Sequence, residues 1–222
     1  MKKLILTAFA LTTAASVFAQ GTVAFNIKTS AGTAHVWGPS TTAPGLSLIG
    51  AASNDNIAGT TPFSASGMSL IGAGNQAGGL YGYGTTLATL LAGPVGAAES
   101  SLVASTPTTT FKSGASLGLI VSTTSTLTGV AKDAAGAVLE MVAWDNSSTL
   151  YPTWAQASVA WAAGTIAAGK SGPFNVALIG GDVNLPPNIG VTSFNLYMVP
   201  EPSTFALAGL GAAAMLIFRR RK

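Results

Sequence analysis

His35 is the only histidine in the chain, so any Ser-His-Asp catalytic set would have to use its imidazole as the base. It lies in the tetrapeptide 34–37 (AHVW), and no acidic residue is near it in sequence. A G-x-S-x-G nucleophile elbow is also absent from the sequence. We therefore expect a structural histidine. A secreted hydrolase is the least favoured alternative, because it needs His35 and an acid, or two acids, to meet in one cleft.

Paired carboxylates are a second route to hydrolysis, because glycosidases place two of them across the scissile bond. The candidates are Glu99, Asp133, Glu140, Asp145 and Asp182. Glu140 and Asp145 are five residues apart, so on one continuous strand they face opposite sides. Asp145 begins an Asp-Asn-Ser turn and is expected to bond local backbone amides there, and Asp133 also lies in a turn. Neither needs catalysis to explain it, and we predict that the protein is not an enzyme.

Metal ligands are equally scarce. The chain has no cysteine and one histidine, which are the side chains that zinc and iron sites depend on. The turns 54–56 (NDN) and 181–184 (GDVN) offer oxygen atoms, but they fall short of a calcium loop. The sequence also has no glycine-rich phosphate loop of the G-x-x-x-x-G-K type. We therefore predict no metal and no cofactor.

Four aromatic side chains are candidates for stacking on a ligand such as a sugar ring: Tyr81, Tyr83, Trp154 and Trp161. The tyrosines lie in the glycine-rich segment 72–84, which predicts a loop. The alternative is that they pack at the start of the following strand. An exposed, coplanar aromatic pair would favour a carbohydrate-binding module, and buried tryptophans would count against one.

The balance of charged residues limits the classes of partner that the protein can bind. Charged residues make up 8% of the 222, against about 25% in an average protein. The hydrophobic content of 48% nevertheless predicts a folded domain. Residues 20–198 hold four Lys and Arg against six Asp and Glu. This faintly acidic domain has no basic patch, so we expect no nucleic-acid partner.

Short apolar runs between Gly, Pro, Ser and Thr predict strands. They cover residues 21–27, 35–37, 108–112, 116–122, 130–145, 174–179 and 193–199. We expect the third and fourth runs to form a hairpin around Ser113-Gly114, and residues 133–136 to form a hairpin turn inside the fifth. The pattern predicts a mostly β fold, a single antiparallel β-sandwich or open barrel-like domain over residues 20–198.

Two segments depart from this pattern. Residues 153–163 (TWAQASVAWAA) contain no breaker, and Thr153 is a suitable N-cap, so they predict a short helix or an irregular loop over the sheet edge. In a helix, Trp154 and Trp161 would share one face. The near-copies 45–51 (GLSLIGA) and 67–73 (GMSLIGA) are too few for a solenoid. They predict paired strands on one side of the sheet, or a chance likeness.

Residues 1–19 have the three parts of a secretory signal peptide. Lys2 and Lys3 give the positive end, residues 4–11 are apolar, and small residues precede a cut between Ala19 and Gln20. The alternative is a short N-terminal membrane helix, for which the apolar part is too short. We predict export through the secretion machinery.

Residues 199–222 have three parts in a fixed order. Pro200, Glu201 and Pro202 form a rigid triplet, an uncharged and mostly apolar run covers 203–218, and four cations follow: Arg219, Arg220, Arg221 and Lys222. A helix over 205–218 would be about 21 Å long, so it needs residues 202–204 or snorkelling arginines to cross a bilayer core of about 30 Å. The cations should stay cytoplasmic, with the domain outside that membrane. The alternative is a permanent C-terminal anchor.

This order of parts resembles the PEP-CTERM sorting domain of bacterial exported proteins. The resemblance implies that a membrane-embedded exosortase recognises Pro200, Glu201 and Pro202, removes the helix and basic tail, and transfers the domain to the cell surface or an extracellular matrix. It also implies a Gram-negative-type envelope and a background of exopolysaccharide or biofilm production.

The domain itself is similar, more weakly, to uncharacterised PEP-CTERM cargo proteins in residues 20–26 (QGTVAFN), 108–111 (TTTF) and 143–145 (AWD). That group implies no activity. We expect an exported, non-enzymatic surface or matrix protein that is anchored in the membrane before processing. The alternative is a carbohydrate-binding module.

Overall fold

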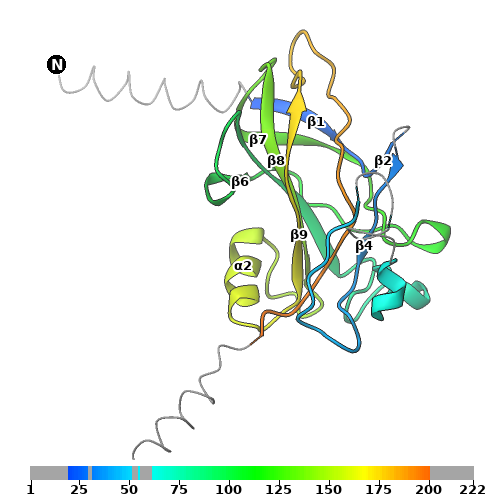
Figure 1. Cartoon of the computed structure of the whole chain (residues 1–222). Helices are drawn as coiled ribbons and strands as arrows, with labels where there is room; N and C mark the ends of the chain where they lie inside the picture. Colours follow the sequence, from blue (N-terminus) through cyan, green and yellow to red (C-terminus); the bar gives the residue numbers. More distant parts are fainter. Residues whose placement is uncertain (1–19, 30–31, 52–54, 56–61, 201–222) are drawn as a thin grey trace, which may run out of the picture.

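A four-stranded antiparallel sheet is the centre of the domain. The computed structural model describes residues 20–29, 32–51, 55 and 62–200, and Figure 1 shows their arrangement. The sheet has the order β6-β5-β8-β9. Its strands are β5 (Thr86–Pro94), β6 (Val103–Ala104), β8 (Gly136–Asp145) and β9 (Ala168–Ala177). Both faces of β8 are covered, so its apolar sequence GAVLEMVAWD is buried from the second residue to the last.

The first face of this sheet packs against a second strand pair. β1 (Gln20–Phe25) runs antiparallel to β7 (Thr123–Ala131). Residues of β1 alternate between half-buried and buried, and Val23 and Phe25 are fully buried in the main core. Alternation of this kind is what a strand with one face on the core requires. Leu90 and Leu139 enter the same core from the central sheet.

Two bridges connect the strand pair to the central sheet. Thr106, just after β6, exchanges backbone hydrogen bonds with Thr126 of β7. Gly180, just after β9, does the same with Thr22 of β1. The hydrogen bonds therefore lead from β6 through β5, β8, β9, β1 and β7 back to β6. These six strands surround the core as a barrel-like ring. The predicted mostly β fold is confirmed.

The second face of the central sheet is covered by the helix α2 (Trp154–Ala162). Thr153 caps it: its hydroxyl oxygen accepts from the backbone N–H of Gln156 and donates to that residue's side-chain oxygen. The Thr153 hydroxyl is therefore an N-cap, and this cap favours the helix over the predicted loop alternative. Trp154 and Trp161 share a face as predicted, with ring centroids 6.0 Å apart, and pack around the fully buried Trp144.

The remaining elements are short. The strands are β2 (Lys28–Thr29), β3 (Gly32–Thr33), β4 (Val36–Trp37) and β10 (Phe194–Asn195). The 3₁₀ turns are η1 (Phe63–Ser66), η2 (Ala73–Asn75), η3 (Glu99–Ser101) and η4 (Gly114–Ser116). β10 pairs in parallel with β4. The glycine-rich segment 72–84 is a loop, as predicted.

Three expectations about pairing need correction. Residues 133–136 do form a turn between β7 and β8, but not a hairpin turn, because β7 pairs with β1 and β8 with β5 and β9. The predicted hairpin around Ser113-Gly114 is reduced to one bridge, Phe111–Ile120. The near-copies do not pair with each other. Ile49 of the first bridges to β10 and Leu70 of the second bridges to β4.

The two predicted membrane-targeting segments, 1–19 and 203–218, lie outside the described residues. Within the described residues, no helix is long and apolar enough to cross a membrane.

Candidate functional site

The last described residues are fixed to the domain by backbone hydrogen bonds. Tyr197 and Ala168, the first residue of β9, exchange bonds of 2.9 and 3.2 Å. The carbonyl of Tyr197 also accepts from the indole N–H of Trp161 at 3.0 Å. The amide of Met198 donates to the carbonyl of Pro44 at 2.8 Å. The chain is therefore held by β9, by α2 and by the turn at Pro44 up to two residues before the Pro-Glu-Pro triplet.

A buried side chain strengthens this attachment. The side-chain oxygen of Asn195, which is 1% exposed, accepts from the amide of Leu48, and its side-chain nitrogen donates to the carbonyl of Leu46. Gly169 allows the approach on the other side, because a Cβ there would lie 2.2 Å from the carbonyl oxygen of Asn195. Sequence reasoning missed this set of contacts, since its members are up to 149 residues apart.

Pro200 is exposed and is the last residue of the described chain, whose final segment passes near α2 (Figure 1). Glu201, Pro202 and the cations Arg219, Arg220, Arg221 and Lys222 lie outside the described residues. Gln20 is the first residue of β1 and pairs with Ala131, whereas Ala19, on the other side of the predicted cut, lies outside them. The structure thus presents the first residue of the triplet at the surface.

His35 meets an acid that sequence proximity did not indicate. Its Nδ1 lies 2.8 Å from Oδ2 of Asp55, and the hydroxyl of Ser193 donates to Oδ1 of Asp55 at 2.6 Å. The same hydroxyl accepts from the backbone N–H of His35 at 2.9 Å. Burial opposes ionisation of Asp55, but the hydrogen bonds from His35 and Ser193 outweigh it and hold the pKa of Asp55 below its ordinary value of 3.8. Nδ1 of His35 therefore donates to a carboxylate.

The hydrogen bonds among Ser193, Asp55 and His35 do not match those of a Ser-His-Asp catalytic triad. In such a triad the imidazole takes the proton of the hydroxyl and the acid orients the imidazole. Here the proton of Ser193 points to the acid, and Ser193 is 0% exposed. The cluster joins Asp55 to the residues that directly precede β4 and β10.

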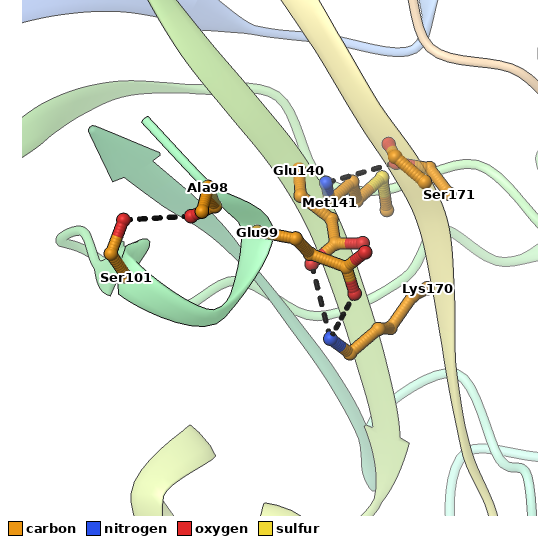
Figure 2. A network of polar contacts seen from close by, with 8 residues as sticks. Ala98, Glu99, Ser101, Glu140, Met141, Lys170 and Ser171 are labelled. Carbon is orange, nitrogen blue, oxygen red and sulfur yellow. Dashed lines mark hydrogen bonds and ion pairs between the residues drawn. The ribbon is translucent and has the colours of Figure 1, made fainter. Parts of the chain in front are cut away.

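A second cluster brings two carboxylates to one lysine (Figure 2). Nζ of Lys170 on β9 lies 2.8 Å from Oε1 of Glu99 and 3.3 Å from Oε2 of Glu140 on β8. The side chain of Glu140 is 1% exposed, and its Oε1 has no hydrogen-bond partner among the described residues. Burial raises the pKa of Glu140 despite the attraction of Lys170. The predicted opposite facing of Glu140 and Asp145 is consistent with their separate partners.

A bulge in β9 positions Lys170. Val142 pairs with Lys170 and Glu140 with Pro173, so Ser171 and Gly172 together oppose Met141. Gly172 has φ +74°, which favours glycine, and the Ser171 hydroxyl accepts from the amide of Met141 at 3.0 Å (Figure 2). No sequence motif marks this cluster, because its three charged residues come from three separate elements.

The other acids hold loops. The carboxylate of Asp133 accepts three backbone amides, from residues 182, 183 and 184, and these bonds hold its pKa below the ordinary value. Asp145 was expected to bond local amides. It accepts instead from the distant amide of Tyr81 at 3.2 Å and from the hydroxyl of Ser147. Among the described residues, no group of three His, Cys, Asp or Glu side chains is arranged to hold a metal ion.

The four aromatic candidates are half-buried. Tyr81 and Tyr83 pack against the main core, and burial, with the charge of Asp145, raises the pKa of Tyr81. The rings of Trp154 and Trp161 are inclined at 49° and belong to the cluster around Trp144. Trp37 stacks in parallel on Phe63, which is fully buried. Within the described part of the chain, these pairs do not form an exposed coplanar platform.

Taken together, the sites define a β-rich domain whose polar clusters join segments of the fold, and whose chain is led to the surface at Pro200. A comparison with protein-family models identifies the class of that segment: residues 199–222 match the PEP-CTERM protein-sorting motif. The segment is therefore a PEP-CTERM sorting signal, and it supports an exported protein that exosortase targets. Searches of curated proteins and of solved structures each gave no match.

Proposed function

We propose that this is a surface or extracellular-matrix protein with a structural or interaction role in the bacterial envelope or biofilm. The secretion machinery exports it, the segment 203–218 anchors it in the inner membrane, and exosortase cuts near Pro200-Glu201-Pro202 to release the domain. The observation that carries the proposal is the sorting motif at 199–222 directly after a folded domain.

The structure of the domain is compatible with two cuts. β1 begins at Gln20, so removal of residues 1–19 would leave every described strand intact. The last backbone bond that fixes the chain is that of Met198, so a cut beyond it would leave Tyr197 and Met198 attached to the domain. Processing at both ends therefore need not unfold the product.

The test is the intact mass of the protein in its native host, with a variant in which Pro200, Glu201 and Pro202 are all alanine. We expect the wild type to lack residues 1–19 and everything beyond the triplet, and the variant to keep its tail. Pro152→Ala is the matched control, because it replaces an exposed proline outside the motif. It should be processed like the wild type.

Retention of Arg219–Lys222 in the wild-type protein would contradict the proposal. The C-terminal segment would then be a permanent anchor, and the domain would work while tethered to the membrane.

A further inference from the structure

The end of the domain from which the chain leaves carries no charge. We define this exit face by the end of α2 and its following turn (161–165), the turn 43–46, and residues 197–200. The two longer segments that contribute to it, 41–51 and 146–169, contain no Asp, Glu, Lys, Arg or His. Leu46 is 37% exposed there, and Trp161 and Tyr197 are half-buried with their rings in edge-to-face contact at 5.0 Å.

Exposed charge is present at the opposite end, and the partly exposed pair Lys170–Glu99 lies between the two ends, two residues along β9 from Ala168. β9 starts at Ala168, which is bonded to Tyr197 on the exit face, and ends at Ala177, which pairs with Gly136 after the β7–β8 turn. At about 3.3 Å per residue these ends are roughly 30 Å apart. The exposed ion pair Lys132–Asp182 belongs to the β7–β8 turn and the segment after β9 (Figure 1). Charged side chains thus begin two residues along β9 from the exit face, and the residues that define the face include none.

The tether between the exit face and the membrane is short. Met198 is the last residue whose backbone is fixed, and the predicted membrane segment begins at Ser203. Five residue steps span at most about 17 Å, at roughly 3.3–3.6 Å each. The headgroup region on one side of a bilayer is about 5–7 Å thick, and the tether has to cross it. The exit face therefore cannot be far from the lipid surface while the segment is in the membrane.

We infer that the exit face lies against the phospholipid headgroups until the C-terminal segment is removed. Its chemistry suits that environment, since Trp and Tyr are enriched at membrane interfaces and an uncharged surface costs little to dehydrate. The tether keeps the face at a high effective concentration near the lipid, so weak contacts are enough. The inference rests on the membrane anchoring in the proposed function, and it adds a defined orientation of the domain.

The absence of cysteine allows a site-specific test. The full chain carrying Ala163→Cys is labelled with an environment-sensitive fluorophore and reconstituted into phosphatidylcholine vesicles, with or without lipids that carry a headgroup-proximal quencher. Ala163 is exposed on the exit face, directly after α2. The control is Val183→Cys, at a side chain that is 85% exposed near the opposite end. Thr165→Cys, also exposed, repeats the test on the neighbouring turn.

We expect the labels at 163 and 165 to emit at shorter wavelength and to be quenched several-fold more than the label at 183. Vesicle flotation is measured on the same samples. If the protein floats but all three labels are quenched alike, the orientation is wrong and the proposed anchoring stands. If the full chain does not float, anchoring and orientation both fail. If the labels at 163 and 165 are the ones that are weakly quenched, the exit face does not contact the lipid and the inference is wrong. A protein partner would then be the candidate for that face.

Discussion

At the residue scale, the charged side chains of this protein act as connectors between distant segments. Asp55 joins His35 to Ser193, Asp133 holds the amides of 182–184, and Lys170 joins Glu99 to Glu140. Glu140 is the most demanding of them, because it is fully buried and one of its oxygens has no partner among the described residues.

The burial of Glu140 predicts that substitutions of the two members of the buried pair, Lys170 and Glu140, change stability by different amounts. Lys170→Met leaves the carboxylate of Glu140 buried without its cation, and we expect it to lower the free energy of unfolding by about 3 kcal/mol. Glu140→Gln removes the buried charge and keeps a side chain of the same shape, so we expect a change within about 1 kcal/mol. Urea denaturation at pH 7 measures both.

The control is the double variant, in which Glu140→Gln should recover most of the loss caused by Lys170→Met. A pH series gives a second check. Because burial raises the pKa of Glu140, the folded state binds the proton more tightly than the unfolded state. The stability that this proton contributes is present below pH 4.5 and is lost as the pH rises through the raised pKa. Glu140→Gln should lack this fall, and an unchanged pH profile would contradict the assignment.

At the element scale, α2 shows how a weak helix is selected by its surroundings. A helix of 9 residues is marginal in isolation. The N-cap Thr153, whose hydroxyl accepts from the amide of Gln156, fixes where it begins, and Trp154 and Trp161 supply the packing on Trp144 that holds it. Because Trp161 also donates to the carbonyl of Tyr197, the helix helps to fix the exit of the chain.

Removal of the cap tests this element. We expect Thr153→Ala to lower the free energy of unfolding by about 1 kcal/mol, because the amide of Gln156 loses its acceptor. Hydrogen exchange at Gln156 should become faster. Thr153→Ser keeps the hydroxyl and should behave like the wild type, and equal stability of the Ala and Ser variants would show that the capping bond contributes nothing.

At the scale of the whole molecule, stability depends on closing the strand order without disulfides. The chain has no cysteine, so the ring is closed by packing and hydrogen bonds and has no disulfide cross-link. The contact between Thr22 and Gly180 joins the first and last strands of the ring. A Cβ on Gly180 would lie 2.7 Å from both the Thr22 hydroxyl and the Cα of Pro186.

We therefore expect Gly180→Ala to destabilise the domain by about 2 kcal/mol or more, through displacement of the Thr22 contact. Thermal unfolding followed by circular dichroism measures the effect. Gly190→Ala is the matched control, since a Cβ there meets no atom within 4 Å, and it should stay within about 0.5 kcal/mol of the wild type. Equal melting temperatures for the two variants would mean that this bridge does not hold the ring together.

The sequence alone predicted the features that depend on local chemistry. Thr153 marked the start of α2, the alternation in residues 21–27 marked β1, and the order of parts in 199–222 marked the sorting motif. Each of these signals is complete within a short stretch, so it needs no knowledge of the rest of the chain.

Only the tertiary structure decided what depends on pairing. β5, in the middle of the central sheet, was not predicted, because its Leu and Ala residues have no intrinsic preference for strands and become extended only by pairing with β8. Asp55 bonds His35 and Ser193, Lys170 bonds Glu99, and Asp145 bonds Tyr81. These partners lie 20 to 138 residues away, and no local pattern encodes such distances. The same holds for the exit face, which forms because β9, α2 and the turn at Pro44 converge on Tyr197 and Met198.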